Sequence, residues 1–391
     1  MDEPADLTFV IDSLTPRGGM ENALIALVRE LANDFRVTVI ALSGSALTDD
    51  TLPPAVTVTY LNVPIGSTRL LRSIAPLRRA LVRRPRPVRL VSVGLWCTAV
   101  LGWVMPRRLN RCVVWEHSLT AQRLSVSPKV RALWLLAQLA LRRSGALVAV
   151  SDVVRDQLER IPRRRGQITV IPNIVDMGPG PSPSPREQSG CDALRLLGVG
   201  SLVAIKNWGL AIRALSHLPP STSLSIAGDG PERAALGHLV RDLGLQSRVH
   251  LLGHRNDVGA LMAEFDLLVH SSLSETFGYT LLEAASHGLP VVACDLPIMN
   301  QLVPRLVPGV LVEATPASFA AGVQACVELR PGPSDWAESS LNRHQEFGKA
   351  KVVGLWRHVL LDEPGSEVQR AGWRGSARWS HRRSGGSKRP R

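Results

Sequence analysis

Residues 265–295 read FDLLVHSSLSETFGYTLLEAASHGLPVVACD. The runs FDLLVH and PVVACD are short and apolar, as expected of buried strands in a parallel sheet. Between them, YTLLEAASHG has apolar residues at helical spacing and ends at Gly288. A strand, a helix and a second strand in this order predict a parallel sheet with helices on its faces.

The same alternation runs through most of the chain. Strands are predicted for LTFVI, VTVIAL, VRLVSV, RCVVWEH, ALVAVS and ITVIPN before residue 174, and for LRLLGVG, LSIAGDG and VHLLG after residue 193. Residues 177–190 are rich in Pro, Gly and Ser, which is typical of a linker. We therefore predict an α/β protein of two Rossmann-like domains, over 1–176 and 191–361, with parallel sheets facing each other across a cleft.

The composition is that of a globular protein without a membrane span. Hydrophobic residues make up 45% of the chain and charged residues 20%. The longest uncharged run, 90–105, is short for a bilayer span, and the acidic N-terminus has no secretory signal pattern. Five cysteines, with no CxxC pair, favour reduced thiols over disulfides or a zinc site. We expect a cytoplasmic protein.

The net charge of +13 comes from two places. Eight arginines and no acid lie between Arg69 and Arg89, and eight Lys or Arg accompany one acid, Glu367, from Gly365 onward. The summed charge of these two runs exceeds the net charge of the chain, so the remaining residues are slightly acidic. In 69–89, apolar residues and arginines recur at helical spacing, which favours a helix on an anionic membrane surface; the alternative is a cytosolic surface helix with an Arg-rich face. The tail, 362–391, has the composition of a disordered segment.

Two glutamates, Glu275 and Glu283, flank a Phe-Gly step at the predicted strand-to-helix turn. An unpaired charge is costly to bury, so packing alone does not account for both. Carboxylates accept hydrogen bonds from hydroxyl groups, and a helix N-terminus attracts anions. A polyhydroxylated ligand with a phosphate would satisfy both, although either glutamate alone could equally be an ordinary surface or ion-paired residue.

At this point the chain resembles the family 4 glycosyltransferases, which are retaining enzymes of the GT-B fold. Their E-x-F-G-x4-E signature matches Glu275, Phe277, Gly278 and Glu283. Other elements follow in the family's order over nearly the whole chain: RGG before a helix, a strand ending in His, VSDVVRDQL and VIPNIVD, GDGPE, and a closing helix with Trp356.

The resemblance implies a role for each matching residue of this stretch. Glu283 would hydrogen-bond the ribose of a nucleotide sugar, and Glu275 the transferred sugar. The amides around Phe277, Gly278 and Tyr279 would contact sugar and phosphate.

Five further positions complete the site that the resemblance implies. Lys206 would bind the diphosphate and stabilise the leaving group. Gly18 and Gly19 would bring backbone amides to the diphosphate. His117 would lie near the sugar or acceptor, and Arg255 near the base or diphosphate. Each of these is also compatible with an ordinary structural or surface role.

Two positions depart from the family pattern. Ser201 stands where the family has an arginine, and a serine cannot neutralise charge. Asn300 and Gln301 stand where a glutamate is usual. No D-x-D motif or P-loop occurs, so we expect no cofactor and a metal-independent reaction in which Lys206 and helix dipoles neutralise the diphosphate.

The resulting hypothesis is a transferase that moves a hexosyl or N-acetylhexosaminyl group, with retention, from a UDP- or GDP-sugar to a glycan or lipid-linked hydroxyl. The N-terminal domain would be the acceptor side, the C-terminal domain would bind the donor, and the last helix could return to the N-terminal domain. Cell-envelope or capsular polysaccharide assembly is the expected setting, with peripheral contact to the inner membrane face through 69–89 and no nucleic-acid partner. Two alternatives remain: a hydrolysing nucleotide-sugar epimerase of the same fold, or a donor- or partner-binding protein without turnover.

Overall fold

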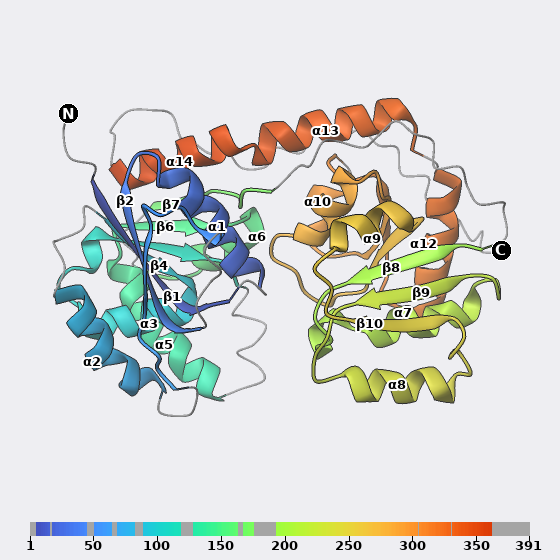
Figure 1. Ribbon diagram of the computed structural model, residues 1–391, viewed down its shortest axis with the longest axis horizontal. Helices are drawn as coiled ribbons and strands as arrows, with labels where there is room; N and C mark the ends of the chain where they lie inside the picture. The colour runs from blue at the N-terminus through green and yellow to red at the C-terminus, as the bar shows by residue number, and fades with distance from the viewer. Residues whose placement is uncertain are drawn as a thin grey trace, which may run out of the picture. The chain divides into compact units, whose positions relative to one another are not determined.

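The computed structural model describes residues 5–15, 18–44, 51–64, 69–82, 89–118, 128–162, 167–175, 193–303, 305–329 and 331–361. The chain divides into two compact units, each built on one parallel sheet (Figure 1). The first unit takes in Met1–Pro179, Ser274–Glu283 and Leu341–Gly372, and the second the rest of the chain. The predicted linker and tail lie outside the described residues, and the predicted domain limits stay a prediction.

The first sheet has seven parallel strands in the order β3-β2-β1-β4-β5-β6-β7. Its strands are β1 (Asp6–Leu14), β2 (Arg36–Gly44), β3 (Thr57–Tyr60), β4 (Arg89–Val93), β5 (Cys112–Glu116), β6 (Ala146–Ala149) and β7 (Gln167–Val170). Phe9 pairs with Val39 on one side and Val91 on the other, and all three are buried. Both faces of these strands are apolar because helices cover both faces of the sheet.

The helices of this unit are α1 (Gly19–Leu31), α2 (Arg69–Val82), α3 (Gly94–Val104), α5 (Pro128–Arg143) and α6 (Asp152–Glu159), with a 3-10 turn η2 (Leu109–Arg111). The uncharged run 90–105 contains all of α3 and all of β4 except Arg89. No described helix combines the length and apolarity needed to cross a membrane.

The second sheet has six parallel strands in the order β10-β9-β8-β11-β12-β13. Its strands are β8 (Arg195–Val199), β9 (Ser223–Ala227), β10 (Val249–Gly253), β11 (Leu267–His270), β12 (Val291–Cys294) and β13 (Gly309–Val312). The helices and 3-10 turns of this half of the chain are η3 (Ala204–Lys206), α7 (Trp208–Ala214), η4 (Leu215–His217), α8 (Arg233–Asp242), α9 (Val258–Glu264), α10 (Tyr279–Ser286), α11 (Met299–Leu302), α12 (Pro316–Leu329), α13 (Pro333–Phe347) and α14 (Lys349–Leu361).

Each sheet has one point at which the strand order reverses. In the first sheet it lies between β1 and β4, and in the second between β8 and β11. Open α/β sheets bind ligands at the carboxyl ends of the strands beside this point. The loops after β1, β4, β8 and β11 are therefore the places to look for a site.

The last helix, α14, packs on the first unit. The indole of Trp356 makes an edge contact with that of Trp115 in β5, with ring centroids 4.9 Å apart. Arg89 donates a hydrogen bond to the carbonyl oxygen of Leu360 (3.0 Å), and Arg357 pairs with Asp34. The chain thus returns to its first sheet after completing the second.

Candidate functional site

The loop after β8 lies tightly against the turn after β9. The backbone N–H of Gly200 donates to Ala227 (3.0 Å), and that of Leu202 donates to Asp229 (3.0 Å). A Cβ on Gly228, which has a φ of +156°, would lie 1.9 Å from the carbonyl oxygen of Gly200. The GDG sequence is therefore required by a close backbone-to-backbone contact.

Lys206 ends this loop, and the loop is joined to the one that follows β11. The Ser271 hydroxyl donates to the carbonyl oxygen of Lys206 (2.8 Å), and the N–H of Leu273 donates to that of Ile205 (2.8 Å). Asn207 adopts a left-handed conformation, with a φ of 48°, between η3 and α7. The loops that follow β8 and β11 are therefore hydrogen-bonded to each other beside the switch point of the second sheet.

Ser201 and Arg255 offer little positive charge to this edge of the sheet. Ser201 is exposed, and its carbonyl oxygen accepts a hydrogen bond from the indole of Trp208 (3.1 Å). The Arg255 guanidinium donates to Asp257 from Nε (2.7 Å) and from a second nitrogen. The Asp257 carboxylate raises the pKa of Arg255, so the charge of this arginine is already balanced locally.

Within the E-x7-E stretch, a turn at Gly278 leads directly into α10. Gly278 has a φ of +84°, and its carbonyl oxygen accepts the N–H groups of Leu281 (3.1 Å) and Leu282 (3.2 Å). Glu275 accepts the N–H of Thr276 (3.0 Å). Glu283 lies in the second turn of α10, and both glutamates are partly buried.

Aromatic rings pack around this stretch, which belongs to the first unit. Phe277 is buried, with its ring centroid 4.7 Å from that of Tyr279 and 5.6 Å from that of Phe347 in α13. The Tyr279 ring lies against Gly19, where a Cβ would be 3.5 Å from the ring. Burial, together with the charge of Glu283, raises the pKa of the Tyr279 hydroxyl. Two of the predicted segments, RGG and E-x7-E, are therefore in contact.

Glu21 is a residue at this place that the sequence analysis missed. Gly18 is the N-cap of α1, and a Cβ on it would lie 2.1 Å from Oε2 of Glu21. The Glu21 carboxylate thus folds back over the helix N-terminus that was predicted to bind a diphosphate. Burial raises the pKa of Glu21, and nearby Asp12 raises it further.

His117 follows β5 and lies on Trp115, with ring centroids 4.4 Å apart. Its Nε2 is buried and has no hydrogen-bond partner among the described residues. Burial lowers the pKa of His117 to about 3, so the imidazole is neutral. The preceding Glu116, also missed from sequence, is fully buried.

The arginine-rich helix α2 buries part of its apolar face, and membrane contact through it stays a prediction. Leu77 is fully buried, and Leu70 and Leu81 are partly buried against the same core, whereas Leu71 and Val82 are exposed. Arg69 donates to both carboxylate and carbonyl oxygens of Asp12 and to the Ser43 hydroxyl (2.6 Å). Three arginines of α2 remain exposed: Arg72, Arg78 and Arg79. Arg83, Arg84 and Arg86 lie outside the described residues.

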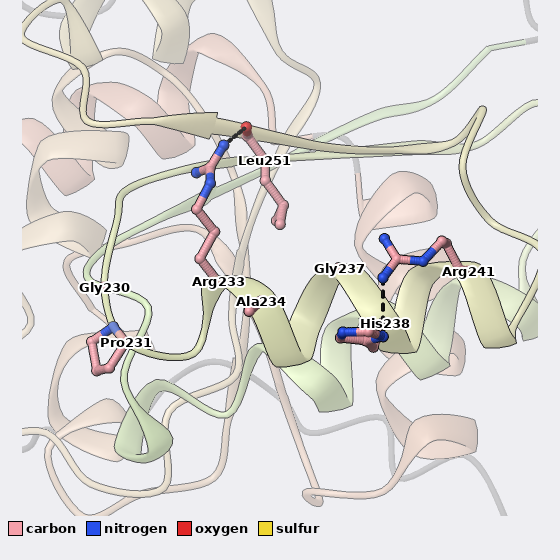
Figure 2. Close-up of a pocket in the computed structure, with 8 residues that line it drawn as sticks. All are labelled: Gly230, Pro231, Arg233, Ala234, Gly237, His238, Arg241 and Leu251. Atoms are coloured by element: carbon pink, nitrogen blue, oxygen red, sulfur yellow. Dashed lines mark hydrogen bonds between the residues drawn. The ribbon is translucent and has the colours of Figure 1, made fainter.

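An open hollow lies between α8 and the edge strand β10 (Figure 2). Arg233 reaches across it to the carbonyl oxygen of Leu251 (3.0 Å), and Arg241 bonds Nδ1 of His238 (3.0 Å). None of the predicted site residues lines this hollow. In the described ranges, no three His, Cys, Asp or Glu side chains group as metal ligands, and metal independence stays a prediction.

Comparison with known proteins assigns both halves of the chain to glycosyltransferase domains. Residues 18–174 match the model of the glycosyl transferase 4-like domain, and 193–328 that of glycosyl transferases group 1. The chain is 43% identical over 101 residues to the lipopolysaccharide glucosyltransferase WaaG of Escherichia coli, covering 25% of this chain and 27% of that protein. It is 32% identical over 148 residues to the lipopolysaccharide core glycosyltransferase LpsD of Rhizobium meliloti, covering 38% and 43%.

Solved structures share the fold over more of the chain. The crystal structure of Anabaena HepE with UDP and glucose superposes with a TM-score of 0.75, at 22% identity, over 92% of this chain and 100% of that one. The stretches aligned with the two curated relatives, in contrast, span less than half of those proteins.

Proposed function

Since this chain belongs to the family 4 glycosyltransferases of the GT-B fold, we propose that it transfers a hexosyl or N-acetylhexosaminyl group from a nucleotide diphosphate sugar to a hydroxyl group. The observation that carries the proposal is the switch point of the second sheet. There the Lys206 loop is hydrogen-bonded to the loop that leads into Glu275 and Glu283. HepE, a structural neighbour, was solved with UDP and glucose, which supports a nucleotide-sugar donor.

Each residue of this edge has a proposed part in the reaction. Glu283 accepts hydrogen bonds from the ribose hydroxyls, and Glu275 from the sugar. Lys206 donates to the diphosphate and offsets the negative charge that develops as the sugar leaves. With no carboxylate assigned as nucleophile, the acceptor hydroxyl attacks from the face that the diphosphate leaves, and the configuration is retained.

The acceptor is proposed to be a glycan or a lipid-linked glycan of the cell envelope. Two relatives named for lipopolysaccharide synthesis support this setting. The exposed arginines of α2 (Arg72, Arg78 and Arg79) would draw the protein to an anionic membrane surface. Leu70, Leu77 and Leu81 pack inward whereas Leu71 and Val82 are exposed, so we propose a contact that is mainly electrostatic, with only a small apolar part.

Donor binding and transfer by the purified protein test the proposal. UDP-, GDP- and dTDP-sugars are screened by thermal shift with wild type, Glu283→Ala and a control, Glu328→Ala, which removes an exposed glutamate of α12. A ligand at about a hundred times its Kd adds about 2.7 kcal/mol of stability. We expect sugars of one nucleotide class to stabilise wild type and the control but not Glu283→Ala. Wild type should also transfer the sugar of that nucleotide to water or to an acceptor.

A binding protein without turnover is the second candidate, because Ser201 replaces the family's arginine and Arg255 is already paired with Asp257. Stabilisation by a nucleotide sugar with no transfer or hydrolysis would favour it. No stabilisation by any of the three nucleotide classes would contradict both candidates.

A further inference from the structure

Glu116 holds the loop that leaves β5. Its Oε1 accepts hydrogen bonds from the N–H groups of His117 (3.1 Å) and Ser118 (2.9 Å) and from the Ser118 hydroxyl (2.7 Å). The residue is fully buried. The N–H groups just past a strand end have lost their sheet partners, and here a side chain replaces them. Three donors on one oxygen fix the direction in which the chain continues.

The same loop is held from two other sides. The His117 imidazole lies on the Trp115 indole, which in turn contacts Trp356 of α14. The side chain of Gln157 in α6 donates to the carbonyl oxygen of Ser118 (3.3 Å). The ring of His117 is therefore fixed, while its buried Nε2 has no partner in the described part of the chain. A fixed ring with an unused nitrogen can bind a substrate hydroxyl.

We propose that Glu116 is a positioning residue for His117. Its Oε1 accepts hydrogen bonds from two backbone N–H groups and one hydroxyl, and these bonds fix the position of His117. The inference rests on the proposed transfer reaction. An amide oxygen can accept the same hydrogen bonds as a carboxylate, so the role does not require a charge. Burial raises the pKa of Glu116, which is consistent with a group that need not be ionised.

A double-mutant cycle separates positioning from general stability. We would measure kcat and the donor KM for Glu116→Gln, Glu116→Leu, His117→Ala and the pair of Glu116→Leu with His117→Ala. Glu116→Leu is expected to lower kcat by about tenfold or more at an unchanged KM, since a displaced group costs orientation. Glu116→Gln should stay within about threefold of wild type. In the His117→Ala background, Glu116→Leu should have no further effect.

Ser144→Ala is the matched control, because Ser144 is buried in the same unit and donates one hydrogen bond to Ala140 (2.9 Å). It should leave kcat unchanged in both backgrounds. If Glu116→Leu does not fold, Glu116→Asp takes its place, since the shorter side chain cannot reach all three donors. Additive effects of Glu116→Leu and His117→Ala, or a Gln variant as slow as the Leu variant, would overturn the inference.

The imidazole NMR signal of His117, identified by its loss in His117→Ala, supplies a readout without turnover. The chemical shift of this signal should change in Glu116→Leu, or in Glu116→Asp if that variant takes its place. It should be unchanged in Glu116→Gln and Ser144→Ala. If wild type turns over no nucleotide sugar, the proposed function fails, whereas an unshifted His117 signal in the disrupting variant refutes the positioning role.

Discussion

Ser201 is exposed at the carboxyl end of β8, where its side chain could reach a ligand bound at the edge of the sheet. An arginine there would add a positive charge to the one that Lys206 supplies. We expect Ser201→Arg to lower the Kd for the nucleoside diphosphate by about tenfold at low salt, and by less as salt screens the charge. Calorimetric titration at two ionic strengths measures this.

The matched control is Ser221→Arg, which adds the same charge at an exposed position before β9, at the opposite edge of the sheet. It should leave the Kd unchanged. Equal Kd values for wild type and Ser201→Arg would mean that the diphosphate does not bind beside Ser201.

His117 should make stability depend on pH. Burial lowers its pKa to about 3 from an ordinary value of 6.5, so between these values the unfolded chain binds a proton that the folded chain does not. The free energy of unfolding therefore falls as pH drops below 6.5, by about 2 kcal/mol at pH 5. Glu116, with a raised pKa, acts in the opposite direction: its stabilisation is lost as pH rises through its folded pKa.

Urea unfolding of wild type and His117→Asn from pH 5 to 8 isolates the histidine, because Glu116 contributes to both proteins. The difference between the two free energies of unfolding should shrink or reverse toward pH 5. Parallel pH profiles would contradict a neutral, buried imidazole.

At the scale of elements, the strands and helices follow from sequence patterns, whereas the contacts between them do not. Apolar runs and glycine stops predict β11, α10 and β12 because these signals are local. Glu116 and Glu21 were missed because no sequence motif surrounds them. Each acquires its role only in the folded chain, where its carboxylate turns back toward the backbone next to it. Arg69 was predicted to lie on an arginine-rich face toward a membrane or solvent, because its partners Asp12 and Ser43 lie far away in sequence.

The turn after β9 gives a prediction about backbone packing. Gly228→Ala places a methyl group 1.9 Å from the carbonyl oxygen of Gly200 at a φ that favours glycine, so the β8 loop must move. We expect a loss of about 1–3 kcal/mol of stability or more, and weaker nucleotide binding through the displaced Lys206 loop. Gly354→Ala, in α14 with open space around it, should instead gain up to about 1 kcal/mol. Thermal unfolding and nucleotide titration of both variants test this, and equal behaviour would refute the close contact.

At the scale of the whole molecule, the alternation of strand and helix patterns predicted two parallel sheets, which the strand order confirms. The return of α14 to the first sheet depends on Trp356 meeting Trp115, a contact between residues more than two hundred positions apart, and sequence spacing gives no distance for it. The sequence likewise shows where the basic residues cluster, but not which side chains they contact, such as Asp12 and Ser43 beside Arg69.

The net charge of +13 gives the last prediction, because two separate regions supply it. Arg72, Arg78 and Arg79 are exposed on α2, while residues from Gly365 onward carry eight Lys or Arg. Each basic residue near an anionic surface contributes about 1 kcal/mol. Replacing these three exposed arginines of α2 with serine should therefore weaken binding to vesicles containing phosphatidylglycerol by about a hundredfold at 0.1 M salt. Removal of 362–391 is the comparison: if it abolishes binding and the serine variant does not, the tail rather than α2 makes the membrane contact.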